Sequence, residues 1–95
     1  MRIYKVLTNV FEYNRRKDIR INSVHHEEVV INNLEYAKAI YIEREKELKS
    51  SFSYSVRGTE RTGTVQLFTP HVHKNGLLAY WPDNDKYILK RDFTD

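Results

Sequence analysis

The sequence contains no cysteine and no long apolar run, and these two absences exclude several classes of protein. Without cysteine there is no disulfide framework, no thiolate zinc site and no cysteine nucleophile. No apolar run approaches the roughly 20 residues that a membrane helix needs. The opening stretch MRIYKVLTNV also lacks the apolar core and cleavage site of a signal peptide. We therefore expect a soluble protein of the cytoplasm, with no membrane partner.

Glycine and proline are also scarce, with 3 and 2 residues, so the chain has no flexible or proline-rich linker. No internal repeat is visible. A chain of 95 residues has the size of one domain. Its hydrophobic content of 40% is too high for a disordered protein. The sequence thus predicts a single domain over residues 1–95.

The excess of positive charge is small. Lys and Arg number 16 against 13 Asp and Glu, which gives a net charge of +3. A dedicated duplex-binding domain usually has a larger excess, so the charge permits a polyanionic partner without requiring one. The frequent Asn, Ile, Lys and Tyr are typical of an AT-rich genome, which suggests a phage or a low-GC bacterium as the origin.

The first half of the sequence predicts two strands and a helix. β-branched and aromatic residues favour a strand over residues 2–13, and a shorter antiparallel strand starts at Ile19 after a polar turn. The His-His-Glu-Glu run at 25–28 interrupts the apolar pattern. A helix is expected over residues 33–49, capped by Asn32 with Glu35 completing a capping box. Its apolar front half should be buried.

The second half predicts two hairpins. Residues 52–68 alternate as a hairpin that folds about Glu60 and Arg61, with Val56 opposite Val65. The pair Asn75-Gly76 favours a two-residue type I′ turn that places His71 opposite Tyr80. A loop at 82–85 then returns the chain so that Tyr87 lies beside Tyr80. A bulge is expected at Pro70, which cannot donate to a strand ladder.

These elements predict an α+β fold. One central helix packs on a twisted antiparallel sheet, in the order N-terminal strands, helix, then β-meander. An unpaired edge strand, near Met1 or in the segment 86–91, could pair with a second copy and form a homodimer.

Two histidines invite a catalytic or metal-binding interpretation. His71 and His73, one residue apart on a strand, point to the same side, which suits zinc or copper. A third ligand would have to come from residues 25–27, and nothing in the sequence brings those close. The chain also carries no catalytic motif of known spacing. We therefore expect no metal, no cofactor and no catalytic residue.

Basic and aromatic residues are the better candidates for a binding surface. Arginine suits bidentate contact with phosphate or carboxylate groups, and tyrosine can stack on bases or anchor a protein interface. The alternative is that the charges only keep the domain soluble. The candidate binding residues are Arg15, Arg16, Lys17, Arg20, Arg57, Arg61, His71, His73, Tyr80 and Tyr87.

The leading hypothesis is a small non-enzymatic protein, encoded by a phage or mobile element. It would act by stoichiometric binding to a nucleic acid or to a nucleic-acid-handling protein complex. An inhibitor of a host defence nuclease, of the anti-CRISPR kind, is one example. The alternative is a small metal-independent RNase of the toxin type that uses His71, His73 and a nearby arginine.

Overall fold

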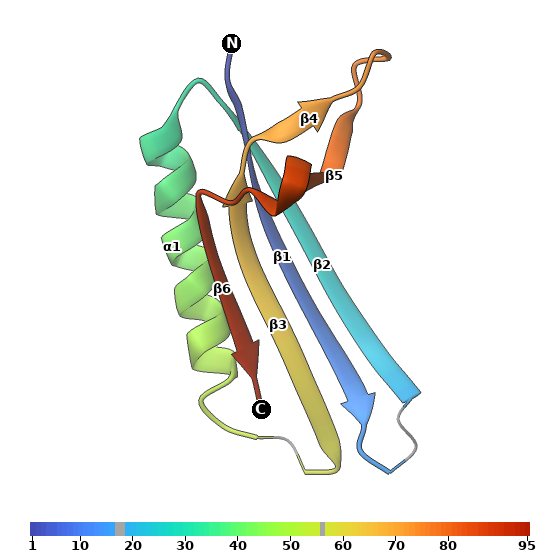
Figure 1. Cartoon of the computed structure of the whole chain (residues 1–95). Coiled ribbons are helices and arrows are strands. Elements are labelled where there is room, and N and C mark those ends of the chain that lie inside the picture. Colours follow the sequence, from blue (N-terminus) through green and yellow to red (C-terminus); the bar gives the residue numbers. More distant parts are fainter. Residues whose placement is uncertain (17–18, 56) are drawn as a thin grey trace.

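The computed structural model describes residues 1–16, 19–55 and 57–95 (Figure 1). The elements in chain order are β1 (Ile3–Asn14), β2 (Ile19–Ile31), α1 (Leu34–Ser51), β3 (Thr59–Phe68), β4 (Pro70–Val72), β5 (Leu78–Pro82), the 3₁₀ turn η1 (Asp83–Asp85) and β6 (Leu89–Thr94). A four-stranded antiparallel sheet has the order β2-β1-β3-β6, and β4 and β5 form a separate two-stranded sheet. The α+β class and the single helix packed on an antiparallel sheet are confirmed.

Strand β1 lies in the middle of the large sheet and is buried on both faces. It pairs with β2 on one side and with β3 on the other, so that Lys5 is opposite both Val29 and Phe68. Val6 contributes to the core beneath α1, while Leu7, on the other face, is also fully buried. This double burial explains why the strand has no clean alternation of apolar and polar residues.

The helix has nearly the expected bounds but a different cap. The side chain of Asn33 accepts a hydrogen bond from the Tyr36 N–H at 2.9 Å, which makes Asn33 the N-cap. Asn32, the expected cap, instead closes the end of β2: its N–H donates to the Arg2 carbonyl, and its side chain accepts from the Arg2 N–H. The prediction of the cap was wrong because Asn32 is taken up by strand pairing.

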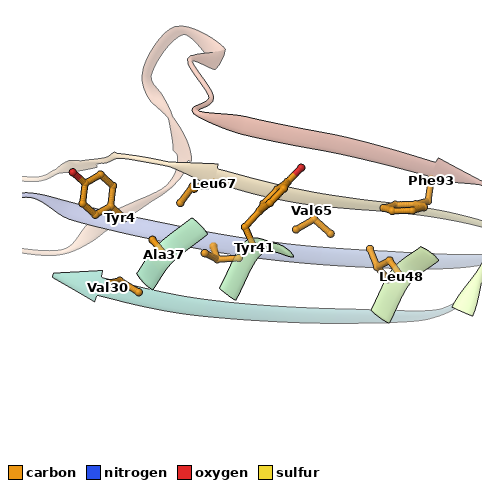
Figure 2. Close-up of a cluster of buried hydrophobic side chains, with 9 residues drawn as sticks. Tyr4, Val30, Ala37, Tyr41, Leu48, Val65, Leu67 and Phe93 are labelled. Carbon is orange, nitrogen blue, oxygen red and sulfur yellow. The ribbon is translucent and has the colours of Figure 1, made fainter. Parts of the chain in front are cut away.

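The core lies between α1 and the large sheet (Figure 2). From the helix, Ala37, Tyr41 and Leu48 enter it. Tyr36 and Ile42, in contrast, are about half exposed, because the sheet covers only one side of the helix. The expectation that the whole front half of the helix is buried is therefore wrong. The buried core residues are Tyr4, Val6, Val30, Ala37, Tyr41, Leu48, Val65, Leu67 and Phe93.

The expected hairpin over 52–68 is also wrong. Phe52 follows the helix directly and its N–H donates to the Leu48 carbonyl. The residue expected to begin the hairpin is therefore the C-cap of α1. The strand β3 pairs with β1 and β6 instead of with residues 52–58. Val56 lies outside the described residues. The apolar ring of Phe52, which suggested a strand, packs on Phe93 at the end of the core, at a centroid distance of 5.6 Å.

In β2, the His-His-Glu-Glu run does not break the strand, which is 13 residues long. The turn after β4 also differs from the expectation. Of its central residues only Gly76 has a positive φ, and the His73 N–H donates to Leu77, so a type I′ turn at Asn75-Gly76 is excluded. The predicted register, with His71 opposite Tyr80, would place Val72 opposite Ala79. Val72 is instead opposite Leu78, so that register is wrong at Val72.

The strands after the helix are connected differently from the expected meander. The chain leaves the large sheet after Phe68, forms β4 and β5, and returns as β6 beside β3. The register of β4 and β5 is irregular between Pro70 and Val72, where we expected a bulge. We call β4, β5 and the turn between them the arm. Figure 1 shows the arm (orange) at one end of the large sheet.

Candidate binding surfaces

One end of the large sheet collects exposed arginines, and we call it the basic end. Asn14 at the end of β1 is opposite both Ile19 and Thr59, so the starts of β2 and β3 lie beside it. The Arg15 N–H donates to the Gly58 carbonyl at 3.3 Å. Gly58 has a φ of 80°, which glycine adopts without strain. The basic end consists of Arg15, Arg16, Arg20 and Arg57, all exposed.

The charge at the basic end is largely free to act on a partner. Among the described residues, none of its four arginines takes part in an ion pair. The Arg20 guanidinium lies 5.6 Å from the centre of the Phe11 ring, which orients this side chain without neutralising it. Lys17, which the sequence placed in the same cluster, lies outside the described residues.

Arg61 is not part of the basic end, although the sequence grouped it with Arg57. Its side chain is only 6% exposed and its Nε lies 2.9 Å from Asp95 Oδ2. It also donates to the carbonyls of Ser51 and Tyr54, at 3.0 and 2.7 Å. The hydrogen bond from Arg61 lowers the pKa of the Asp95 carboxyl. Arg61 therefore holds the end of α1 against β3 and does not reach a partner.

His71 and His73 lie in the arm, at the far end of the sheet from the basic end (Figure 1). Both are exposed, with ring centres 5.2 Å apart, and His71 Nδ1 lies 3.4 Å from Asp83 Oδ2. Within residues 1–16, 19–55 and 57–95, no three His, Asp or Glu side chains are grouped as metal ligands would be. The structure does not bring these histidines and the arginines of the basic end together.

Tyr80 fastens the arm to the large sheet. Its hydroxyl donates to Asn9 Oδ1 at 3.0 Å and lies 2.7 Å from His25 Nδ1. Its ring stacks on the His25 ring with centres 5.0 Å apart. Tyr87 packs edge-on against Phe68. Because His25 stacks on one face of the Tyr80 ring, that face is not available for stacking with a nucleic-acid base.

Sequence reasoning missed the polar network beneath Tyr80. Lys5 is almost fully buried, donates to the Ala79 carbonyl at 3.3 Å and forms an ion pair with Glu27. The hydrogen bond from Lys5 lowers the pKa of Glu27. His25 Nε2 lies 3.7 Å from the same carboxylate. The available signal was a lysine between the apolar residues Tyr4 and Val6, but the partners of this lysine are distant in sequence.

The arm also presents an aromatic side chain that the sequence did not single out. Trp81 is 51% exposed and packs against Tyr80 with ring centres 4.5 Å apart. A pocket of about 260 Å³ lies next to the arm. It is lined by Thr69, Asp83, Lys86, Tyr87 and Ile88. Its lining combines the carboxylate of Asp83 and the ammonium group of Lys86 with the side chains of Tyr87 and Ile88.

A groove of about 320 Å³ lies between α1 and the exposed strand β2. At its rim, Arg44 forms an ion pair with Glu28. Desolvation works against ionisation of Glu28, but the hydrogen bonds from Arg44 and His26 outweigh it and lower its pKa. The hydroxyl of Thr8 is buried with no hydrogen-bond partner among the described residues. The groove is lined by Thr8, Val10, Val24, His26, Arg44, Glu47 and Leu48.

Comparisons with protein-family models, curated proteins and solved structures find no match to this chain. In the described part of the chain, no helix is long and apolar enough to cross a membrane.

Proposed function

We propose that this protein is a non-enzymatic binding protein whose basic end holds a nucleic acid, either free or within a nucleic-acid-handling protein complex. The observation that carries the proposal is the gathering of Arg15, Arg16, Arg20 and Arg57 at one end of the sheet. These arginines come from separate segments of the chain and have no ion-pair partner among the described residues.

Arginine is well suited to this role. Its planar guanidinium donates two parallel hydrogen bonds to a phosphate and keeps its charge at any physiological pH. Phosphate contacts release counterions from the nucleic acid, so affinity falls as salt rises. With about four contacts to duplex DNA, log K should fall with log salt with a slope of about −3 to −4.

The narrower form of the proposal is a cytoplasmic protein of a phage or mobile element that inhibits a host defence nuclease, in the anti-CRISPR manner. The 95-residue length and the Asn-, Ile-, Lys- and Tyr-rich composition support this form. Binding at the basic end would then engage the nucleic acid carried by the nuclease.

Fluorescence anisotropy with labelled single-stranded DNA, double-stranded DNA and single-stranded RNA across a salt series tests the proposal. The variant is Arg16→Ala/Arg57→Ala. The matched control is Arg2→Ala/Lys74→Ala, which removes the same charge from exposed residues away from the basic end. We expect the variant to lose at least about tenfold in affinity, since two charge-assisted hydrogen-bonded contacts are removed, while the control stays within about twofold.

Two results would overturn the proposal. The first is an affinity that does not change with salt for any of the three oligonucleotides, or an equal loss in variant and control. The second is cleavage of the labelled RNA by the wild-type protein that is lost in His71→Ala/His73→Ala, which would establish the RNase alternative.

A further inference from the structure

The two edges of the large sheet differ in how open they are. In the described chain the order β2-β1-β3-β6 leaves β2 and β6 at the edges. The edge expected near Met1 is thus wrong, because β1 is internal. β6 is six residues long and carries Lys90 and Arg91, the kind of charges that guard an edge. β2 has 13 residues without lysine, proline or glycine, and almost all of them are exposed.

The backbone of β2 is available for a further strand. The Asn32 N–H donates to the Arg2 carbonyl, which identifies this opposed pair as a hydrogen-bonded one. In an antiparallel ladder such pairs alternate, so from Asn22 to Ile31 the even-numbered residues bond to β1. The N–H and C=O groups that point to the free edge therefore belong to Ser23, His25, Glu27, Val29 and Ile31.

Both ends of β2 carry exposed apolar side chains. Ile21, Val29 and Ile31 are 55%, 49% and 56% exposed. On the helix face, the half-exposed Val24 forms one wall of the groove beside Leu48. Exposed aliphatic side chains on an unpaired strand favour pairing with another strand.

We propose that β2 pairs antiparallel with β2 of a second copy of this chain, around a twofold axis at His26. In this register His25 lies opposite Glu27 of the second copy. Ile21, the extra residue where the pairing of β2 with β1 shifts, lies opposite Ile31 at the limit of the regular segment. The twofold axis repeats each pair. The His25–Glu27 pair therefore occurs twice near the centre of the interface, and the Ile21–Ile31 pair occurs once at each end. No carboxylate faces another carboxylate, since Glu28 lies opposite Val24.

The self-complementary order of residues favours a second copy over an unrelated strand. A twofold pairing is isologous and closes after two subunits, whereas pairing of β2 with β6 of another copy would leave open edges and continue into a fibre. The dimer has one continuous sheet of eight strands. Because its two β2 strands run antiparallel, the two basic ends lie at opposite ends of the strands. Of the four arginines of the basic end, only Arg20 belongs to β2, whereas Arg16 and Arg57, which the binding test removes, lie outside it. The dimer and the proposed function can therefore be tested separately.

Cysteine substitution tests the register directly, since the chain has no native cysteine. His26→Cys places two thiols on the axis in a non-hydrogen-bonded pair, whose Cα atoms are about 4.5 Å apart and within disulfide range. Val24→Cys, on the same face, is the matched control. Its two thiols would lie four residues apart along the strand, roughly 13 Å. After mild oxidation we expect a cross-linked dimer from His26→Cys and none from Val24→Cys.

Sedimentation or light scattering measures the mass of the full chain in solution. We expect a species of twice the 11.4 kDa chain mass. Ile21→Lys/Ile31→Lys should raise the dissociation constant at least tenfold, because it places lysines opposite one another. Tyr36→Lys/Ile42→Lys, at similarly exposed helix positions, should leave it unchanged. Far-UV circular dichroism checks that each variant is folded. A wild-type monomer at every concentration, or cross-linking of Val24→Cys as efficient as that of His26→Cys, would overturn the proposal.

Discussion

Arg61 and Asp95 form an ion pair in which both side chains are almost completely removed from water, at 6% and 2% exposure. The pair joins the start of β3 to the residue that follows β6, and Arg61 extends the link to the end of α1 through the Ser51 carbonyl. Three elements that are distant in sequence thus meet at one guanidinium.

Removal of the carboxylate should be costly. Asp95→Ala leaves a buried arginine without its counter-ion, and we expect the free energy of unfolding to fall by about 3 kcal/mol. Asp92→Ala, an exposed aspartate in β6, should change it by less than about 0.5 kcal/mol. Urea denaturation followed by circular dichroism measures both. Equal effects for the two variants would show that the ion pair does not stabilise the fold.

Acid should destabilise the protein below about pH 4.5. The pKa values of Glu27, Glu28 and Asp95 are lower in the folded protein than their ordinary values of 4.5, 4.5 and 3.8. A carboxyl with a lowered folded pKa stabilises the fold above its unfolded pKa, and this contribution is lost as the pH falls through the folded pKa. Urea midpoints between pH 7 and pH 3 should therefore be flat at first and then decline. In Asp95→Ala the decline should be shallower than in the wild type; an unchanged slope would contradict the assignment.

The hydroxyl of Tyr80 should hold the arm in place. Tyr80→Phe removes its hydrogen bonds to Asn9 and His25 while keeping the stacked ring, and we expect a local cost of about 1 kcal/mol. Amide hydrogen exchange in β5 should accelerate by roughly fivefold, because that cost lies mainly in arm opening. Exchange in the middle of β3 should stay the same. Uniform acceleration in both strands would mean that Tyr80 acts on global stability instead.

A side chain at Gly63 should destabilise the fold. A Cβ at this position would lie 3.1 Å from two atoms of the Phe52 ring. That ring cannot easily retreat, because Arg61 and Phe93 pack against it. We expect Gly63→Ala to cost about 1–3 kcal/mol in urea denaturation. Phe52→Leu should relieve part of this loss, so that the double variant is less destabilised than the sum of the single changes. Strict additivity would exclude the clash.

The sequence carried enough local information for the helix and for β1. The apolar face of 34–48 and the Asn-rich start define α1. A segment rich in β-branched and aromatic residues and without glycine or proline defines β1. It failed over 52–58, where an apolar and polar alternation equally suits a strand and a helix end closed by Phe52. The pairing of β3 with β1 and the packing of Phe52 on Phe93 distinguish the two, and both join residues distant in sequence.

The candidate surfaces were predictable only where their residues are close in sequence. Arg15, Arg16 and Arg20 are close in sequence, so their grouping could be inferred from one predicted turn. Arg57 joins them only because β3 pairs with β1. Arg61 leaves them because its partner is Asp95, the residue that follows β6. The open edge of β2 depends on strand order, which the alternation of side chains does not encode.

The central position of β1 has a consequence for the order of folding during synthesis. Its hairpin with β2 is local, whereas its pairing with β3 joins Lys5 to Phe68 and must wait until the whole helix has left the ribosome. The ion pair of Arg61 forms later still, because Asp95 follows β6 in the chain. We therefore expect the contact between the end of α1 and the start of β3 to stay mobile and hydrated in the nascent chain. It becomes buried and ordered only when β6 pairs with β3.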